Sequence, residues 1–471
     1  RRNGEEIDYG YDPIGQVSSA QSRQPGYDFS YAYDPAGNPV RQSKNGFVMS
    51  NAFNRLNQIM NGTWSGTATV LGEVDATGAT VRVNNRIATL LPAGRYAATG
   101  IPLVGGTNSL TAVVTDAAGR SATSRVDVIA KNKTYGHDLN GNMTNDADKV
   151  YAYDEENRLI RVTERGTGKL LVQNRYDGLS RRRERIMLEQ NGSYSTNRYV
   201  YHGWLVKAVL NARNEILETY THGPDLSGTL EGAGGIGGIL AELINGTTRW
   251  YHPDLMGNIT LLTTTSRTPT TRITYDPFGQ VLETKGPMPR YQFSSKEYDG
   301  VVGLNYYGYR CYSSQIGRWV NRDPIEEGGG LNLSAFVANA FPNAVDPVGL
   351  DVWSIDVAVS GSIAILTGYT ATFTLTFDSE ECTIDISGPQ YTGITFAPPN
   401  STEDVADLQS SSVIKNEDCC TNDNKPGKRL QMQYVHRVRS YTVHGFKGWG
   451  ARMLRTTNII PNTIDCDCKQ I

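Results

Sequence analysis

"FSYAYDPAGNPV", residues 29–40, decides how this sequence is expected to fold. Aromatic and small residues alternate in its first half, so one face of an extended strand carries Phe29, Tyr31 and Tyr33. Turn-forming residues follow, because Asp34 can bond the backbone two residues on and Gly37 accepts a positive φ angle. The stretch therefore predicts a strand, a tight turn and a second strand, with tyrosine facing a core.

This tyrosine–aspartate unit recurs along the first 290 residues, and adjacent copies lie roughly 18 to 24 residues apart, a solenoid-like period. The clear copies are Tyr11-Asp12-Pro13, Tyr33-Asp34-Pro35, Tyr153-Asp154, Tyr176-Asp177 and Tyr275-Asp276-Pro277. Weaker copies begin at Phe53, His137 and Tyr251. One hairpin is too small to be stable alone, whereas stacked hairpins share a core. We therefore interpret the repeated pairs as turn and core residues without a catalytic role.

Composition agrees with a β-rich protein. The 471 residues include 49 glycines and 26 tyrosines, and only 38% are hydrophobic. No long amphipathic helical period is present, so we expect an all-β fold. The net charge of -3 is too small to indicate a polyanionic partner for the whole chain, and no run of 18 apolar residues predicts a membrane span. The start at Arg1, without a leader, suggests a fragment or processed product.

Residues 63–132 interrupt the repeats. They contain about seven short stretches of strand character, separated by turn signals every 8 to 12 residues. These signals are Asp75-Ala76-Thr77-Gly78, Asn84-Asn85 and Asp116-Ala117-Ala118-Gly119. We expect an inserted β-sandwich, which resembles the Ig-like modules of bacterial surface and secreted proteins. It is either a spacer or a module that binds a glycan or a protein.

The repeats resemble the YD repeats of the Rhs family, which teneurins and the C subunits of Tc toxins share. Two further stretches carry the resemblance: "DLSGTLEGAGGIGGILA" (residues 225–241), and residues 290–350, which resemble the Rhs-associated core region almost end to end. The resemblance implies a β-strip spiralling into a hollow shell, with the C-terminal segment inside as enclosed cargo. Within the core region we expect a buried aromatic plug, made of Tyr306, Tyr307, Tyr309, Tyr312 and Trp319, with Cys311 buried among them.

The resemblance also implies a self-cleavage site. In these families a DPxGL string ends the core region and the chain is cut after its leucine, which here is the bond between Leu350 and Asp351. The implied chemistry is that of aspartic proteases, in which two carboxyl groups share one proton. The implied pair is Asp323 and Asp346, with Arg322 as a positive neighbour. From residue types alone both Asp-Pro pairs could be turns, and Ile325-Glu326-Glu327-Gly328 departs from the family's usual continuation.

The last 121 residues differ in character. "YTATFTLTFD", residues 369–378, predicts an amphipathic strand. Five of the six cysteines lie in this region: Cys382, Cys419, Cys420, Cys466 and Cys468. Disulfides, free thiols and a metal site all remain open for them, although their spacing is not that of a zinc ribbon. No metal ligand set and no cofactor is predicted.

Charge divides this region. Residues 351–424 hold 12 acidic and one basic residue, and residues 425–471 hold nine basic and two acidic residues. The basic half combines aromatic residues with His436, Arg437, Arg439 and His444, which are the materials of a nuclease: cations for phosphate and two histidines for acid–base catalysis. An ordinary strand pair with a polar face, or another toxin activity, fits the same residues.

Five segments result. Residues 1–62 and 133–289 are predicted as YD-repeat shell, 63–132 as the insert, 290–350 as the core region and 351–471 as the C-terminal variable domain. The function expected from the resemblance is a secreted or cell-surface shell that encloses, cuts loose and delivers a C-terminal toxin. An immunity protein and a secretion-system component are possible partners, and nucleic acid is a possible partner of the C-terminal domain only. The alternative is an adhesive or structural surface protein without a toxin.

Overall fold

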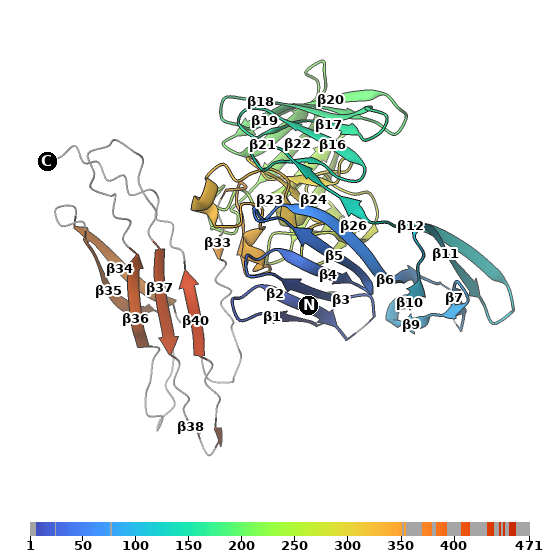
Figure 1. The fold of residues 1–471 in the computed structure, drawn as a ribbon, viewed down its shortest axis with the longest axis horizontal. Coiled ribbons are helices and arrows are strands. Elements are labelled where there is room, and N and C mark those ends of the chain that lie inside the picture. The colour runs from blue at the N-terminus through green and yellow to red at the C-terminus, as the bar shows by residue number, and fades with distance from the viewer. Residues whose placement is uncertain are drawn as a thin grey trace. The chain divides into compact units, whose positions relative to one another are not determined.

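The computed structural model describes residues 6–23, 25–75 and 78–350, together with the backbone of strands within 353–457. The chain divides into two compact units, residues 1–353 and 354–471, and each is described by itself. Strands dominate the described residues, which confirms the predicted all-β class (Figure 1). Four short 3-10 helices interrupt them. Among the described residues, no helix has the length and apolar character needed to cross a membrane.

Two antiparallel sheets are built from the repeats. The first has the order β1-β2-β3-β4-β5-β6-β10-β9, with β13 beside β6. Its strands are β1 (Ile7–Tyr11), β2 (Val17–Ser22), β3 (Asp28–Tyr33), β4 (Pro39–Lys44), β5 (Phe47–Phe53), β6 (Ile59–Glu73), β9 (Thr89–Leu91), β10 (Arg95–Pro102) and β13 (Lys133–Thr134). Phe29 and Tyr31 of β3 are buried, as their alternation predicts.

The second sheet has 14 strands, each paired with its neighbour in chain order from β14 to β27. They are β14 (Gly136–His137), β15 (Met143–Asn145), β16 (Lys149–Tyr153), β17 (Leu159–Glu164), β18 (Leu170–Tyr176), β19 (Arg182–Leu188), β20 (Tyr194–His202), β21 (Leu205–Leu210), β22 (Ile216–His222), β23 (Ile239–Ile244), β24 (Thr247–Pro253), β25 (Ile259–Thr264), β26 (Pro269–Tyr275) and β27 (Val281–Lys285). Only the link between β22 and β23 is long.

The turns explain this regularity. In the turn after β3, one carboxylate oxygen of Asp34 accepts hydrogen bonds from the amides of Ala36 (3.0 Å) and Asn38 (2.9 Å). Gly37 has φ 75°, a conformation that favours glycine. The strand register shifts between Ala32 and Tyr33, which is a β-bulge directly before the turn. The same Asp-centred bonds recur after β1, β16, β18, β24 and β26, so each repeat closes its own hairpin.

The insert is a two-layer sandwich. One layer consists of the far half of β6 with β10 and β9, and the other has the order β12-β11-β7-β8. The additional elements are β7 (Thr80–Val83), β8 (Arg86–Ile87), η1 (Pro92–Gly94), β11 (Gly106–Thr115) and β12 (Ser121–Ala130). Val81, Val83, Ile101 and Leu110 are buried between the layers. Because β6 runs for 15 residues, one strand of the repeat sheet continues into the insert across the predicted boundary at residue 63.

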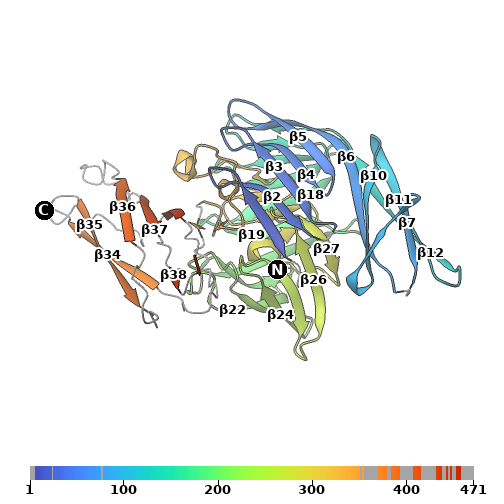
Figure 2. The ribbon, with the colours of Figure 1, turned by 90° about the horizontal axis from the view of Figure 1, so that it is seen from below.

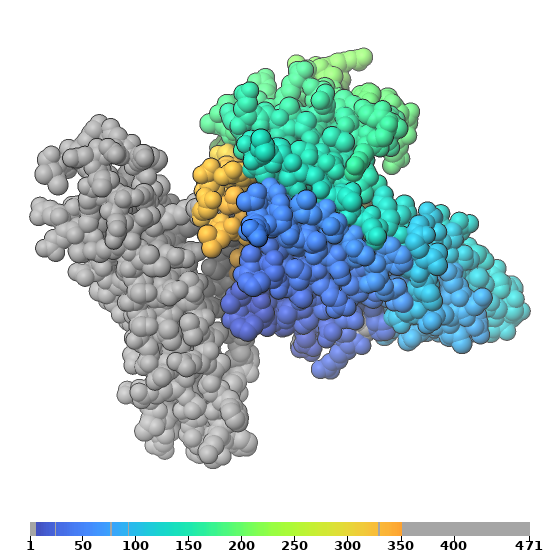
Figure 3. Space-filling model, viewed as in Figure 1, coloured from blue at the N-terminus to red at the C-terminus, as the bar shows by residue number. Residues whose placement is uncertain are grey.

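Residues 290–350, which we call the core segment, contact both repeat sheets. Its elements are η2 (Phe293–Ser295), β28 (Glu297–Asp299), β29 (Leu304–Tyr306), β30 (Cys311–Ser313), β31 (Arg318–Trp319), η3 (Glu326–Gly329), η4 (Val337–Asn339) and β32 (Ala344–Val345). Arg318 donates to Asn38, in the turn between β3 and β4 of the first sheet (2.9 Å), and the backbone of Arg182 in the second sheet donates to Tyr306 (2.8 Å). Figure 2 shows the segment between the two sheets, and Figure 3 shows part of it, in orange, at the surface between them.

The centre of the core segment is aromatic. Tyr312, Trp319 and Phe336 pack with ring centroids 4.1 to 5.6 Å apart, and Tyr307 lies against all three. Cys311 is a free, buried thiol. The expected plug is thus present around Tyr307, Tyr312 and Trp319, and it includes Phe336, which the sequence had not singled out.

The second unit is described by its strands. These are β33 (Trp353–Ser354), at the junction, then β34 (Thr370–Asp378), β35 (Thr383–Thr392), β36 (Asp407–Ile414), β37 (Gln431–Arg437), β38 (Thr442–Val443), β39 (Phe446–Lys447) and β40 (Arg452–Thr457). The predicted amphipathic stretch forms β34, paired with β35, and β37 lies between β36 and β40. The five candidate disulfide residues Cys382, Cys419, Cys420, Cys466 and Cys468 lie outside the described residues.

Candidate functional site

The DPVGL string forms a tight turn, residues 346–350, held by one side chain. An oxygen of Asp346 (Oδ1) accepts hydrogen bonds from the backbone amides of Gly349 (2.6 Å), Leu350 (3.1 Å) and Val348 (3.3 Å). The carbonyl of Val348 accepts from the amide of Tyr309 (3.0 Å). These bonds use the chemistry of the repeat turns, but here the aspartate is buried, with 1% of its surface exposed. The turn therefore fixes the backbone up to Leu350.

One arginine joins this turn to the second candidate aspartate. The guanidinium of Arg310 donates through Nη1 to Oδ2 of Asp323 (2.5 Å) and through Nη2 to Oδ2 of Asp346 (3.0 Å). Its Nε donates to the carbonyl of Gly349 (2.6 Å). The guanidinium also lies over the ring of Trp319, 4.2 Å from its centroid. Two carboxyl groups and the backbone before Leu350 thus meet on a single cation.

The surroundings of Asp346 shift its pKa. Burial raises the pKa of Asp346, and the positive charge of Arg310 and the amides of Gly349 and Leu350 only partly oppose it. The other oxygen of Asp323 accepts from the amide of Ile325 (3.1 Å). Two buried carboxyl groups, one of them with a raised pKa, thus bind the same guanidinium.

Arg322, the sequence candidate for the positive neighbour, lies elsewhere. Its guanidinium donates to Glu326 (3.2 Å) and to the carbonyl of Asn140 (3.4 Å), and its side chain is 30% exposed. Glu326, one of the two extra acidic residues, pairs with Arg322 and not with the aspartates. Arg310, which sequence reasoning missed, occupies the position that Arg322 was expected to fill. Its only sequence signal was its place within the core region.

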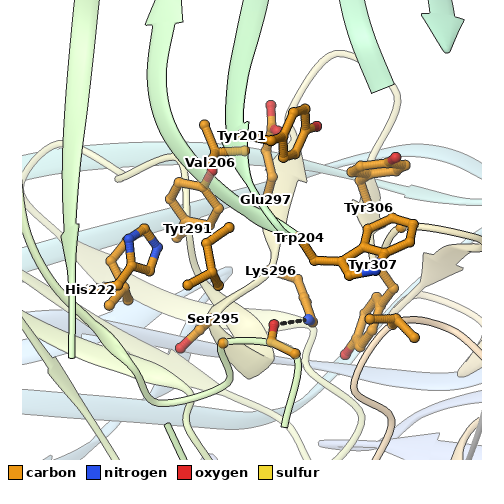
Figure 4. Close-up of a pocket in the computed structure, with 16 residues that line it drawn as sticks. Tyr201, Trp204, Val206, His222, Tyr291, Ser295, Lys296, Glu297, Tyr306 and Tyr307 are labelled. Atoms are coloured by element: carbon orange, nitrogen blue, oxygen red, sulfur yellow. Dashed lines mark hydrogen bonds between the residues drawn. The ribbon is translucent and has the colours of Figure 1, made fainter. Parts of the chain in front are cut away.

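A small cavity of about 60 Å³ adjoins the turn (Figure 4). Val348, Gly308, Trp204, Tyr307 and Lys296 are among the residues that line it. Lys296 is buried, with 7% of its surface exposed, and donates through Nζ to the carbonyls of Pro347 (2.5 Å) and Gly234 (2.8 Å). Sequence reasoning also missed Lys296, since it stands 51 residues before Pro347 in the chain.

The remaining candidates lie at the edge of the described structure or beyond it. Leu350 is half-buried, and Asp351 lies outside the described residues. His436 and Arg437 are in β37, opposite Met453 and Arg452 of β40, whereas Arg439 and His444 lie outside the described residues. Where residues are described, no group of three or more His, Cys, Asp or Glu side chains could hold a metal ion.

The chain is similar to known YD-repeat proteins. The family model of the teneurin YD-shell matches residues 123–327. The tRNA3(Ser)-specific nuclease WapA of Bacillus spizizenii is 27% identical over 247 residues, which cover 50% of this chain and 10% of WapA. Toxin subunit YenC1 of Yersinia entomophaga is 25% identical over 389 residues, 72% of this chain and 38% of YenC1. Toxin protein Tse5 of Pseudomonas aeruginosa is 28% identical over 263 residues, 49% of this chain and 20% of Tse5.

The chain thus spans between about a tenth and two fifths of the length of these relatives. Among solved structures, the crystal structure of TcdB2-TccC3-Cdc42 matches with a TM-score of 0.39 and 19% sequence identity. That match covers 74% of this chain and 18% of the matched chain.

Proposed function

From the premise that this chain is a YD-repeat protein of the Rhs toxin family, we propose that it cuts its own backbone after Leu350 and so frees residues 351–471 as an effector. Residues 1–62 and 133–289 are the shell, 63–132 the insert and 290–350 the segment that carries the cut. The names of the relatives, among them toxin subunits and nucleases, support a toxin as the released part.

The observation that supports self-cleavage most is the triad of Arg310, Asp323 and Asp346. A guanidinium buried with two carboxyl groups holds both in one orientation and stabilises negative charge near them. A purely structural ion pair needs only one carboxylate for each cation, whereas this arginine also grips the carbonyl of Gly349, next to the bond that would be cut.

The arrangement suggests a different role for each carboxyl group. Asp346, whose pKa burial raises, holds the proton, and Asp323 acts as the base. Asp323 takes a proton from a water molecule, whose oxygen attacks the carbonyl carbon of Leu350. Arg310 stabilises the charge that develops on the two carboxyl groups. The bond to Asp351 breaks when its nitrogen receives the proton from Asp346, which leaves a new carboxylic acid group on Leu350 and a new amine on Asp351.

The rest of the proposal concerns what is released. Residues 351–471 are the cargo of the shell, and an immunity protein and a component of a secretion system are the partners that such a cargo requires. The protein is secreted or displayed on the cell surface. Nucleic acid is the substrate class that the basic half of the cargo, with His436 and His444, would suit.

We predict that Asp323→Asn, Asp346→Asn and Arg310→Lys each abolish the cut. An amide cannot transfer the proton, and an ammonium lacks the planar fork that binds both carboxyl groups and the Gly349 carbonyl. The measurement is a denaturing gel of the purified full chain, with the new ends identified by mass spectrometry. Wild type should give fragments 1–350 and 351–471.

Asp177→Asn is the matched control. Asp177 accepts two turn amides, from Leu179 (2.9 Å) and Arg181 (3.0 Å), but belongs to an ordinary repeat turn. Its variant should be cut like wild type. An intact wild-type chain, or full cleavage in both the Asp323→Asn and the Asp346→Asn variant, would falsify self-cleavage by these carboxyl groups.

A further inference from the structure

The glycine-rich loop, residues 225–238, has no role in the chemistry described so far. It links β22 to β23 and is held closed by Asp225, whose Oδ2 accepts the amides of Ala233 (2.8 Å) and Gly235 (3.0 Å). Between these two amides lies Gly234, with φ 62°. A Cβ atom at this position would be 1.9 Å from the carbonyl oxygen of Pro347. The loop therefore touches the DPVGL turn at a point where only glycine fits.

Lys296 fastens this contact. Its ammonium donates to the carbonyls of Gly234 (2.8 Å) and Pro347 (2.5 Å), one from each partner, and lies 5.4 Å from the ring centroid of Tyr307. The neighbouring Ser295 is fixed as well, since it accepts from the amide of Gly237 (3.0 Å) and donates to the carbonyl of Gly257 (2.7 Å). Figure 4 shows Lys296 between the loop and Tyr307.

We propose that Lys296 and Gly234 are positioning residues for self-cleavage: they hold the Pro347 carbonyl and so clamp the DPVGL turn at a second point besides the one that Arg310 binds. This assignment rests on the proposed function. Arg310 grips the turn at Gly349 and Lys296 grips it at Pro347, so both ends of the Pro347–Gly349 backbone are fixed. A turn held at two points presents the Leu350 carbonyl in one orientation, which is what attack by an activated water requires.

The clamp depends on charge. Burial lowers the pKa of Lys296 to about 8, while the carboxylates of Asp346 and Asp225 counteract part of that fall. The other titratable side chains around the same cavity are His222, Glu297, Tyr201, Tyr291, Tyr306 and Tyr307. Below pH 8 the ammonium is present and donates charged hydrogen bonds to the carbonyls of Gly234 and Pro347. Above pH 8 it loses its proton, and these hydrogen bonds weaken.

The first test follows the rate of self-cleavage against pH. Precursor of the full chain, purified unfolded in denaturant, is diluted into buffers on both sides of pH 8, and the cut is timed on denaturing gels. In wild type the rate should fall as the pH rises through about 8. Lys296→Arg should still be cut and should lose this fall, because arginine stays charged. If the fall came from the aspartates it would persist in Lys296→Arg, which would overturn the assignment.

Lys296→Met has similar length but no charge. We expect the rate below pH 8 to drop by roughly 10- to 100-fold, the equivalent of one charge-assisted hydrogen bond. Circular dichroism of the refolded protein controls for folding. A folded Lys296→Met variant that is cut at the wild-type rate would overturn the role of Lys296.

The second test uses glycine variants and leaves every charge in place. Gly234→Ala forces the loop away from Pro347 and should slow the cut. Gly228→Ala is the matched control, because Gly228 lies in the same loop with φ 77° but has nothing within 4 Å of the added Cβ. It imposes the same backbone strain without the clash and should be cut like wild type. Equal rates for the two variants would contradict the clamp.

The two levels of proposal fail differently. If wild type is never cut, the proposed function fails and the clamp with it. A second outcome is that wild type is cut, the Asp323→Asn and Asp346→Asn variants are not, and the Lys296 and Gly234 variants behave like wild type. In that case the two aspartates keep their proposed role and only the clamp is wrong.

Discussion

At the scale of the residue, buried charges mark where the core segment meets the sheets. Glu297, with 4% of its surface exposed, forms ion pairs with Arg182 (2.6 Å) and Arg290 (2.9 Å) and accepts a hydrogen bond from the hydroxyl of Tyr199 (2.8 Å). Burial alone would raise the pKa of Glu297, but the surrounding arginines outweigh it and bring it to about 2. An isolated charge in such a place would be strongly destabilising, and Glu297 is matched by Arg182 from the distant strand β19 and by the nearby Arg290.

We predict that Glu297→Gln lowers the free energy of unfolding by about 3 to 5 kcal/mol at neutral pH, because it leaves buried arginines without their countercharge. Since the folded pKa lies below the unfolded value of about 4.3, the contribution of Glu297 is full above that value and is lost as the pH falls toward 2. Urea unfolding at neutral and acid pH measures both effects.

The control for this prediction is Glu156→Gln. Glu156 also pairs with an arginine, Arg158 (2.9 Å), but its side chain is 63% exposed. Exposed pairs contribute little, so the control should change stability by less than about 1 kcal/mol. A similarly small change for Glu297→Gln would contradict a stabilising role for the buried pairs.

At the scale of the element, the repeat is a hairpin that is stabilised by hydrogen bonds of its own tyrosine and aspartate. The repeat tyrosine sits at the bulge before the turn, and its hydroxyl donates to a carbonyl one repeat back: Tyr33 to Val17, Tyr176 to Leu159 and Tyr275 to Ile259, each at 2.8 Å. Aspartate closes the turn and tyrosine ties it to the previous hairpin. The pairing of these two residue types therefore has a structural cause.

Substitutions of two turn glycines can show whether a repeat turn also packs against the core segment. Gly15 and Gly279 occupy the same turn position, with φ 88° and 85°. A Cβ on Gly15 meets nothing, whereas one on Gly279 would be 2.4 Å from the ring of Phe293. We predict that Gly15→Ala lowers stability by about 1 kcal/mol and Gly279→Ala by several kcal/mol more. Thermal unfolding followed by circular dichroism compares them, and equal losses would show that Phe293 can move aside.

At the scale of the whole molecule, the core segment connects regions that the sequence keeps far apart. Arg318 reaches Asn38 across 280 residues, and Arg322 reaches Asn142 across 180. Lys296 also joins Gly234, in the loop between β22 and β23, to Pro347, so the contacts around the DPVGL turn are complete only when the second sheet and the core segment have come together. A cut that depends on this assembly would free the C-terminal region only from a completed fold.

The proposed function of residues 351–471 gives the last prediction. Expression of residues 351–471 alone should arrest bacterial growth and degrade cellular RNA, because basic and aromatic residues flank His436 and His444 in the sequence. The double variant His436→Ala/His444→Ala should relieve the arrest, and Gln431→Ala, in the same strand as His436, should not. Growth curves and RNA gels measure the two effects. Normal growth with intact RNA would favour the surface-protein alternative.

The sequence by itself determined the all-β class, the repeats and their turns, because the bonds of each turn lie within five consecutive residues. It also singled out Asp323 and Asp346, through a family resemblance. Only the tertiary structure decided what surrounds them. Arg310 and Lys296 lie 36 and 51 residues before their partners in the DPVGL turn, and no local sequence pattern predicts either contact. Local backbone geometry can be read from neighbouring residues, but the partner of a buried charge is chosen by the packing of distant segments.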